Sequence, residues 1–211
     1  LLEGINQVQV NTAVDLTFAN ALRAMLRQAP NVVMLGEIRD YETASIAINA
    51  SLTGHLVFST LHTNDAPSAV TRLTDIGVKP FLIASATRCL MAQRLVRKIC
   101  SKCEVPTTPD KSDLLALGLD LDKIKDPNFL AGKGCDKCNG TGHKGRFGLF
   151  EVFVVDDESR KMIVNKVTTT ELRRRAREVG MRTLREDGAR KAVAGMTTAN
   201  EVLRVTVGDE D

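Results

Sequence analysis

The chain has 211 residues, of which 43% are hydrophobic and 26% are charged, and its formal net charge at pH 7 is +3. This balance excludes a wholly disordered chain, and the length suits one large domain or a core with smaller attachments. The longest apolar stretch, 80–91, is interrupted by Thr87 and Arg88, so the sequence predicts no membrane-spanning helix.

The first hundred residues alternate between helix and strand signals, which is typical of an α/β sheet packed by helices. Thr17 can cap the first helix, and Pro30 stops it. The apolar run that follows predicts a central parallel strand covered on both faces, and the next strand would join it through a right-handed crossover. The expected elements are a helix over 18–26, a strand over 32–35, a helix from 40 to about 54 and a strand over 55–61.

Two further helices are expected before the first cysteine pair. Asp65 and Pro67 fit the start of one helix and Gly77 fits its end. Pro80 opens the other, whose helical pattern includes Cys89. We therefore expect Cys89 to be a small buried hydrophobic side chain and not a reactive thiol.

The composition changes at Cys100. From there to Arg146 glycine, proline, aspartate and lysine are frequent and one short helix is expected near 114–117, which indicates a small metal-organised insert. A strand is predicted over 149–155, and the remainder is expected to be helical. Two capping boxes mark helix starts, Thr168 with Glu171 and Thr198 with Glu201. Two glycines, Gly180 and Gly195, lie where helices are expected to end. The predicted helices cover about 171–179, 184–194 and 199–205.

Four of the five cysteines form two Cys-x-x-Cys pairs, Cys100 with Cys103 and Cys135 with Cys138. Four soft thiolates on two chelating turns match a closed tetrahedral Zn²⁺ site, and because no position is left open the zinc is expected to be structural. The N-terminus shows no export signal, so the paired thiols indicate metal binding in the reducing cytoplasm and not disulfides.

Residues beside the second cysteine pair support this interpretation. Gly140 and Gly142 permit a tight backbone that can aim amide hydrogens at the sulfurs. His143 is near enough in sequence to compete as a ligand, but four cysteines already satisfy the metal.

Glu37 lies at the expected carboxyl end of the first strand, where open α/β sheets bind ligands. A glutamate there can order Mg²⁺-bound waters or activate the water that attacks a γ-phosphate. The alternative is a purely structural carboxylate that is stabilised by the dipole of the following helix.

His55 and His62 flank the second strand. A spacing of seven residues points them to opposite faces of an ideal strand, so a two-histidine metal centre is not expected. Both histidines could still reach the end of the sheet near Glu37, and His62 with Thr60 and Thr63 could contact a nucleotide phosphate. Structural histidines are the alternative.

Three segments taken together resemble the Walker B and histidine boxes of the secretion ATPase superfamily. They are Met-Leu-Gly-Glu-Ile-Arg-Asp over 34–40, Glu-Thr-Ala over 42–44 and Thr-Gly-His-Leu-Val-Phe-Ser-Thr-Leu-His-Thr-Asn over 53–64. The resemblance continues through nearly the whole chain, over 92–97, the cysteine pairs, 145–151, 180–188 and 202–205.

The resemblance implies roles for five residues around a bound nucleotide. Glu37 would be the catalytic glutamate, and His55 and His62 would be histidine-box residues near the γ-phosphate. Arg39 and Thr60 would bind or sense the nucleotide beside them. The implied substrate is ATP with Mg²⁺.

The resemblance also implies a fold, an α/β RecA-like P-loop NTPase core that is truncated at its N-terminal side. The predicted segments are a partial ATPase core with the Walker B and histidine boxes over 1–99, a zinc-binding subdomain over 100–146 and a mostly helical C-terminal subdomain over 147–211. In this family a Gly-x-x-x-x-Gly-Lys-Ser/Thr loop, an acidic box and interface arginines lie upstream of the segment that 1–11 resembles. No such loop occurs in the 211 residues, so the fragment alone is expected to hydrolyse no ATP.

The intact protein, by resemblance, would be a cytoplasmic hexameric ring that hydrolyses ATP. It would associate peripherally with the inner membrane through a platform protein and drive type IV pilus assembly or type II secretion. The tetracysteine insert suggests this assembly and secretion branch, since retraction motors of the superfamily generally lack it. The choice between pilus assembly and secretion stays open.

Two other classes of function are compatible with parts of the sequence. The cysteine pairs and the positive net charge also suit a zinc-ribbon module that binds nucleic acid, but that class leaves the histidine box unexplained. The arginines at 173–177 are expected to form a solvated helix face, and few aromatic residues could stack on bases, so no nucleic acid is expected. A chain that only mediates contacts in a ring is the third possibility.

Overall fold

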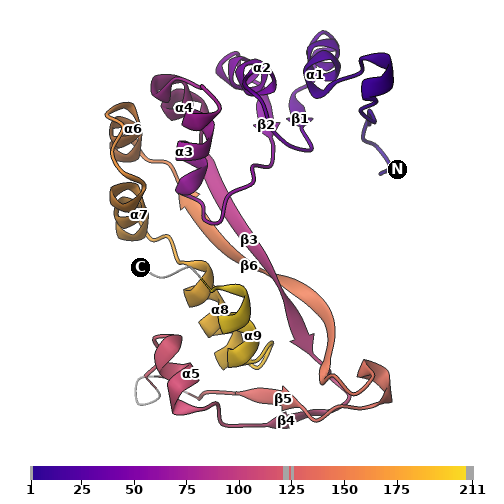
Figure 1. Cartoon of the computed structure of the whole chain (residues 1–211), viewed down its shortest axis with the longest axis vertical. Helices are drawn as coiled ribbons and strands as arrows, with labels where there is room; N and C mark the ends of the chain where they lie inside the picture. The colour runs from indigo at the N-terminus through magenta and orange to yellow at the C-terminus, as the bar shows by residue number, and fades with distance from the viewer. Residues whose placement is uncertain (1, 121–123, 125, 208–211) are drawn as a thin grey trace. The chain divides into compact units, whose positions relative to one another are not determined.

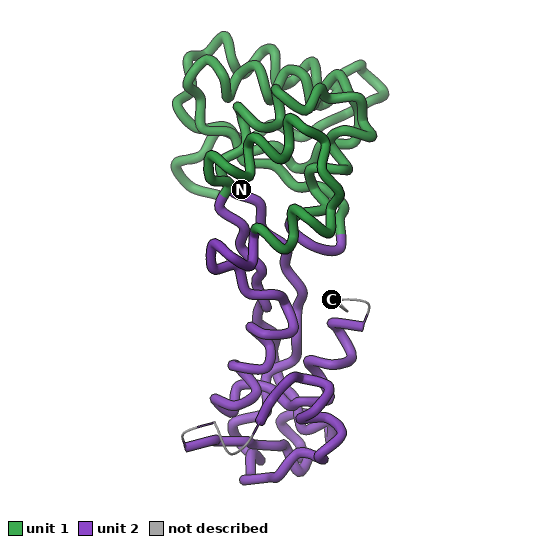
Figure 2. The backbone as a smooth tube through the Cα atoms, turned by 90° about the vertical axis from the view of Figure 1, so that its left-hand side faces the viewer, with its two compact units in different colours: residues 1–63, 67–88, 155–175 green, residues 64–66, 89–154, 176–211 purple. Residues whose placement is uncertain are grey.

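The computed structural model describes residues 2–120, 124 and 126–207 of the chain. These residues form two compact units, each assembled from separate stretches of sequence (Figure 2). Of the described residues, those within 1–63, 67–88 and 155–175 belong to unit 1, and those within 64–66, 89–154 and 176–211 belong to unit 2. The predicted boundaries after residues 99 and 146 stay predictions. Within unit 2 the strand before the first cysteine pair is hydrogen-bonded to the strand after the second pair.

Unit 1 is mostly helical around one short pair of strands (Figure 1). Its elements in chain order are η1 (Thr12–Val14), α1 (Phe18–Leu26), β1 (Val32–Met34), α2 (Tyr41–Leu52), β2 (Leu56–Phe58), α3 (Ser68–Asp75), α4 (Pro80–Ala86) and α6 (Asp157–Val164). Helix α7 (Thr169–Glu178) begins in unit 1 and ends in unit 2. Leu22 and Ile83 are fully buried in the core of unit 1, and burial of such a side chain contributes about 1.5–3 kcal/mol to the free energy of unfolding.

The first helices begin and end where their local sequence predicts. The hydroxyl of Thr17 accepts a hydrogen bond from the Asn20 amide at 3.2 Å, and the Asp40 carboxylate accepts one from the Thr43 amide at 2.8 Å. Both contacts satisfy amide hydrogens that have no partner within the first helical turn. Gly54 has a φ of 104° and ends the α2 region, since a left-handed conformation favours glycine.

Strands β1 and β2 pair in parallel, as the crossover pattern predicts, with Val33 opposite Val57. The prediction that both faces of β1 are covered is wrong for the described residues. Val33 is buried, but Val32 and Met34 on the other face are 56% and 74% exposed. Periodicity alone could not reveal this, because an apolar face has the same sequence whether or not something packs on it.

Unit 2 combines two antiparallel strand pairs with short helices (Figure 1). Its elements are β3 (Cys89–Ile99), β4 (Glu104–Pro106), α5 (Lys111–Ala116), β5 (Leu130–Gly132), η3 (Asp136–Cys138), β6 (His143–Val154), α8 (Leu184–Val193) and α9 (Ala199–Val205). Strand β3 pairs with β6, and β4 pairs with β5. Helices α8 and α9 pack on the β3–β6 pair, where Leu149, Phe153, Leu184 and Val202 are fully buried.

Cys89 is the first residue of β3, so its expected place in a buried helix is wrong. Helix α4 ends at Ala86, the backbone of Thr87 is extended, and Cys89 pairs with Val154 of β6. Its side chain is exposed. Pairing with a strand 65 positions away in the sequence overrides the local helical pattern, because cross-strand hydrogen bonds and packing decide β structure.

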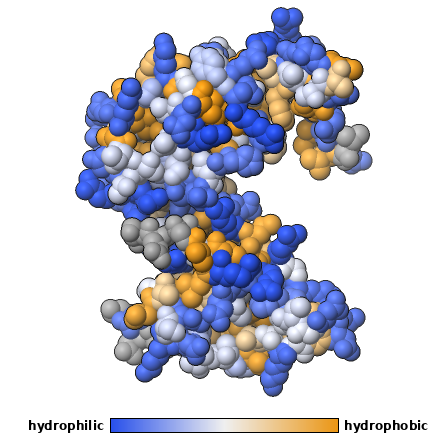
Figure 3. All heavy atoms as spheres, in the orientation of Figure 1, coloured by the Kyte–Doolittle hydropathy of each residue, from blue (hydrophilic) through white to orange (hydrophobic). Residues whose placement is uncertain are grey.

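One face of the β3–β6 pair is apolar and exposed. Side chains on a strand alternate between faces, so the face opposite α8 and α9 carries Met91, Leu95, Val152 and Val154. Phe150 alternates with Leu149 in the same way, but its ring lies 5.1 Å from Nζ of Lys191 on α8. Figure 3 shows hydrophobic side chains at the surface over the middle of these two strands.

The capping boxes of the C-terminal helices differ from one another. Thr168 and Glu171 exchange both predicted hydrogen bonds, at 2.9 and 3.2 Å. At Thr198 the hydroxyl accepts from the Glu201 amide, but the Glu201 carboxylate binds Arg97 and Arg204, so the predicted box forms only in part. The helices end near Gly180 and Gly195, both with positive φ, as predicted.

Among the helices that the structure describes, none combines the length and the apolar character that crossing a membrane requires.

Candidate functional sites

Glu37 is held by two side chains in unit 1. Its Oε2 atom lies 2.6 Å from Nε of Arg39 and 3.0 Å from Nε2 of His62. The Glu37 side chain is 18% exposed, whereas those of Arg39 and His62 are 69% and 77% exposed. The carboxylate is therefore sheltered, while its partners remain accessible to a ligand.

The parallel pairing of β1 and β2 continues beyond the strand ends and creates this contact. The Leu35 amide donates to the Phe58 carbonyl at 2.8 Å, and the Ile38 amide donates to the Thr60 carbonyl at 3.0 Å. The Thr60 hydroxyl also donates to the Gly36 carbonyl at 2.6 Å. Residues after one strand are thereby tied to residues after the next, as expected at the carboxyl edge of a parallel sheet.

The surroundings of Glu37 keep its carboxyl group ionised. Hydrogen bonds from Arg39 and then from His62 lower its pKa below 4.5, against a smaller opposing effect of burial. An ionised carboxylate can accept a hydrogen bond from a water molecule or hold a Mg²⁺-bound water. Thr60 lies within the same cluster but uses its hydroxyl to bond the backbone.

His55 lies at the other end of β2. It precedes Leu56, the partner of Val32 at the start of the pair, whereas Glu37 and His62 follow the strands. Its Nδ1 atom lies 3.0 Å from the Ala50 carbonyl oxygen and 3.2 Å from the Thr53 hydroxyl. Of the two histidines expected to reach Glu37, the structure brings only His62 there.

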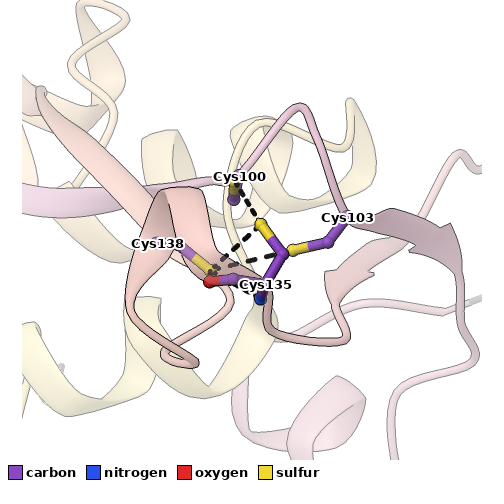
Figure 4. Close-up of side chains that lie close together, drawn as sticks. All are labelled: Cys100, Cys103, Cys135 and Cys138. Atoms are coloured by element: carbon purple, nitrogen blue, oxygen red, sulfur yellow. Dashed lines mark hydrogen bonds between the residues drawn. The ribbon is translucent and has the colours of Figure 1, made fainter.

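The four paired cysteines converge in unit 2 (Figure 4). Their sulfur atoms all lie within 4.8 Å of one another. Three separations are 3.9 Å between Cys100 and Cys135, 3.9 Å between Cys103 and Cys138, and 3.7 Å between Cys135 and Cys138. Four sulfurs bound tetrahedrally to zinc, each at about 2.3 Å, lie about 3.8 Å apart, so the cluster fits a single zinc ion.

Glycine backbones allow the segments on either side of the second cysteine pair to approach each other. A Cβ atom on Gly132 would lie 2.1 Å from the Gly142 carbonyl oxygen, and one on Gly134 would lie 2.6 Å from the Gly140 carbonyl oxygen. Only glycine fits these approaches without a shift of the backbone. Gly140 and Gly142 are predicted from the sequence, whereas Gly132 and Gly134 are not, although the Gly-Lys-Gly sequence just before Cys135 signals a tight backbone there.

Amide hydrogens point at the sulfurs as predicted. The Cys135 amide donates to the Cys138 sulfur at 3.2 Å. Burial acts to raise the pKa of the Cys138 thiol, but hydrogen bonds from the amides of Cys135 and Gly142 and from neighbouring thiols lower it to about 6, whereas burial and the neighbouring thiols raise the pKa of Cys103 to about 12. A thiolate at neutral pH is the form that binds zinc.

His143 does not join the cysteine cluster. Its Nδ1 atom lies 3.0 Å from the Thr141 carbonyl oxygen, and its buried Nε2 atom has no hydrogen-bond partner. Across the part of the chain that the structure describes, the four cysteines are the group of His, Cys, Asp and Glu side chains arranged to hold a metal. The four donors are thus the cysteines named from their spacing.

The sequence matches a known family over most of its length. Residues 1–204 match the model of the type II/IV secretion system protein family. The chain is 53% identical over 206 residues to a type IV pilus assembly ATPase PilB of Thermus thermophilus and 51% identical over 205 residues to a type II secretion system protein E of Pseudomonas aeruginosa. These alignments cover 98% and 97% of this chain but 23% and 40% of the relatives, so the chain spans less than half of their length.

Solved structures of related ATPases share the fold. The pilus retraction motor PilT with bound ADP superposes with a TM-score of 0.61 at 25% identity, over 90% of this chain and 44% of that chain. The Legionella pneumophila ATPase DotB superposes with a TM-score of 0.63 at 23% identity, over 98% of this chain and 48% of that chain.

Proposed function

Because the chain belongs to the type II/IV secretion system protein family, we propose that it is part of an ATPase that powers protein secretion or pilus assembly. The observation that carries this proposal is the contact of Glu37 with Arg39 and His62 at the carboxyl end of the β1–β2 pair. Relatives named as ATPases of pilus assembly and secretion, at 44–53% identity, support it.

Glu37 would orient the attacking water. Its ionised carboxylate accepts a hydrogen bond from that water, whose oxygen then attacks the γ-phosphorus of ATP. The bond from the γ-phosphorus to the bridging oxygen breaks, ADP leaves, and the water proton passes by way of the carboxylate to phosphate or solvent. Mg²⁺, when bound, would neutralise part of the phosphate charge, and the carboxylate of Glu37 would accept a hydrogen bond from a water molecule bound to that ion.

His62 and Arg39 would orient Glu37 and meet the phosphates. Both donate to the same oxygen of Glu37, which leaves Oε1 for water. Both side chains are more than two-thirds exposed, so each can exchange its carboxylate contact for a phosphate oxygen. Thr60 and His55 would also contact the nucleotide. Thr60 is placed beside Glu37 by its hydrogen bond to the Gly36 carbonyl, whereas His55 would contact a part of the nucleotide that lies away from Glu37.

Other parts of the catalytic machinery would lie outside these residues. The 211 residues contain no Gly-x-x-x-x-Gly-Lys-Ser/Thr loop, and we propose that the parent protein supplies it, as well as interface arginines, in a hexameric RecA-like ring. The ring would be cytoplasmic and would bind an inner-membrane platform protein. Pilus assembly and type II secretion are both represented among the relatives, at 53% and 51% identity.

The cysteine cluster would hold a structural zinc. Cys100, Cys103, Cys135 and Cys138 fill a tetrahedral shell, so no position remains for a substrate. Nothing in the comparisons supports the alternative of a nucleic-acid-binding zinc ribbon. Absence of binding to DNA and RNA at low salt would end that alternative.

The test compares ATP hydrolysis by the parent protein with that of the 211-residue chain. We expect Glu37→Gln in the parent protein to lower kcat at least about 100-fold while ATP binding persists. Glutamine has the same size and shape as glutamate but lacks the carboxylate that would accept the proton of the attacking water. Glu104→Gln removes an exposed carboxylate from unit 2 and should leave kcat unchanged. Full activity of the Glu37 variant, or Mg²⁺-dependent hydrolysis by the chain alone, would contradict the proposal.

A further inference from the structure

Unit 2 contains a cavity of about 510 Å³ between helix α9 and the segments that carry β4, α5 and β5 (Figure 1). Every residue that lines it belongs to unit 2. Cavities of this volume hold small organic ligands. The side chains on its walls therefore indicate which ligand it would take.

A buried carboxylate holds two arginines on one wall of the cavity. Oε2 of Glu201 lies 2.7 Å from Nη2 of Arg97, and Oε1 of Glu201 lies 2.8 Å from Nη2 of Arg204. The Glu201 side chain is 1% exposed, whereas those of Arg97 and Arg204 are 47% and 60% exposed. Glu201 thus fixes both guanidinium groups from behind and leaves them open to a ligand.

One carboxylate neutralises only one of the two guanidinium groups. The contacts with Glu201 use Nη2 of Arg97 and both Nε and Nη2 of Arg204, so the Nη1 group of each arginine remains available. An excess of one positive charge with free N–H donors matches a carboxylate, which has one negative charge and two acceptor oxygens.

Two aspartates line the same cavity from α5. Asp110 is the N-cap residue of α5 but its side chain makes no cap hydrogen bond, and Asp113 lies in the first turn. Among the described residues, Arg97 and Arg204 pair with Glu201 and not with these aspartates. Because like charges repel, the aspartates disfavour a dianion such as phosphate and favour a ligand that also carries a cationic group.

His143 lines the cavity and lacks a hydrogen-bond partner. Its Nδ1 atom lies 3.0 Å from the Thr141 carbonyl oxygen, which can only accept, so Nδ1 carries the hydrogen. In an uncharged ring Nε2 is then an acceptor. This buried atom has no partner in the part of the chain that the structure describes, so a ligand that donates to it would complete its hydrogen bonding.

We propose that this cavity binds a small zwitterion, namely an amino acid or a short peptide with free ends. The carboxylate of the ligand would bind Arg97 and Arg204, and its ammonium group would donate to His143 and the aspartates. Its apolar part would lie against Phe129 and Ala131, which also line the cavity. The inference does not depend on ATP hydrolysis, because none of these residues is assigned to ATP.

Isothermal titration calorimetry of the parent protein, purified with zinc, measures the binding of two probes, leucine and leucyl-leucine. We expect saturable binding of at least one probe with a Kd of about 1 mM or below. The tighter binder shows whether the site takes a single amino acid or a peptide. If neither probe binds saturably, the inference is wrong.

Capped forms of the tighter probe test its two charged ends. The N-acetyl form lacks the ammonium group, and the C-terminal amide lacks the carboxylate. Each should bind at least about tenfold more weakly, because each loses hydrogen bonds between charged groups. Equal binding of either capped form, or tighter binding of inorganic phosphate than of both probes, would overturn the inference.

A cavity-filling variant locates the site. Ala131→Leu fills part of the cavity and removes no charge, so we expect it to abolish probe binding. Ala116→Leu makes the same change at an exposed position of α5 outside the cavity and should bind as the unmodified protein does. Thermal unfolding checks that Ala131→Leu is folded, and equal probe binding by these two variants would place the ligand elsewhere.

Charge variants test the walls if Ala131→Leu does not fold. Asp113→Asn should reduce the preference for the free probe over its N-acetyl form, and Arg204→Gln should reduce the preference for the free probe over its amide. Preferences that stay unchanged in both variants would show that neither wall contacts the ligand.

Discussion

The Nε2 atom of His62 lies 3.0 Å from Oε2 of Glu37, although 25 positions separate the two residues in the sequence. Each residue follows a strand, and the parallel pairing of β1 with β2 brings the two strand ends together. Arg39, two residues after Glu37, donates to the same carboxylate oxygen. A phosphate that approached this pair of donors would therefore compete with the Glu37 carboxylate for them.

Arg39→Gln should raise the pKa of Glu37. The Arg39 hydrogen bond is the largest cause that lowers this pKa, and His62 is the second. The chemical shift of ¹³C-labelled Glu37 can be followed as a function of pH in the 211-residue chain. We expect the midpoint of this titration to rise toward 4.5 in Arg39→Gln and to rise by a smaller amount in His62→Ala. An unchanged midpoint in both variants would mean that neither contact forms in solution.

Zinc should be bound by the four cysteines and should stabilise unit 2. We expect about one zinc per chain, and Cys138→Ser should reduce the zinc content and lower the melting temperature. At free zinc a thousandfold above Kd, the linkage is worth about 4 kcal/mol. Metal content by mass spectrometry and thermal unfolding with and without chelator measure both effects.

Cys89→Ser is the matched control for the zinc prediction. Cys89 is exposed on β3 and lies outside the cysteine cluster, so this variant should keep its full zinc content. Equal zinc loss from Cys89→Ser and Cys138→Ser would show that the cluster is not the site.

Glu201→Gln should destabilise unit 2 at neutral pH but not in acid. Burial opposes ionisation of Glu201, but hydrogen bonds from Arg204 and Arg97 outweigh it and lower its pKa to about 2. Because the folded pKa lies below the ordinary 4.5, the stabilisation is complete above pH 4.5 and is lost as the pH falls toward about 2. The shift corresponds to about 3 kcal/mol.

Urea unfolding of the Glu201 variant at pH 7, 5 and 3 checks this dependence. Glu158→Gln removes a carboxylate whose ion pair with Lys161 is exposed, and it should change stability by less than about 0.5 kcal/mol. If Glu201→Gln is as stable as the unmodified chain at pH 7, the contacts of Glu201 with Arg97 and Arg204 contribute nothing to stability.

Gly188→Ala should destabilise α8 although alanine favours helices. A Cβ atom there would lie 2.3 Å from Cγ1 of Val202 and 3.1 Å from Cδ1 of Leu149. The helix preference for alanine is worth about 1 kcal/mol, and overpacking costs about 1–3 kcal/mol, so we expect a net loss. Thermal unfolding should show that adding Val202→Ala restores part of the loss, and a stabilised single variant would contradict the close contact.

Local patterns correctly predicted the features that depend on neighbouring residues. The cysteine spacing identified the four thiols that converge, because a Cys-x-x-Cys turn brings both of its sulfurs to one side. Thr17, Asp40 and Thr168 cap helices because a cap needs only atoms within three residues of it. The resemblance of 34–40 and 53–64 to known boxes likewise required only the linear sequence.

Only the tertiary structure decided the features that depend on distant pairing. It moved Cys89 from an expected helix into β3, directed the Glu201 carboxylate to Arg97 instead of its own helix cap, and separated His55 from Glu37. It also left one face of β1 exposed and placed Arg94 and Glu151 on Asn64–Ala66. Each outcome is set by which strand lies beside which, and that choice depends on packing between residues that are far apart along the chain.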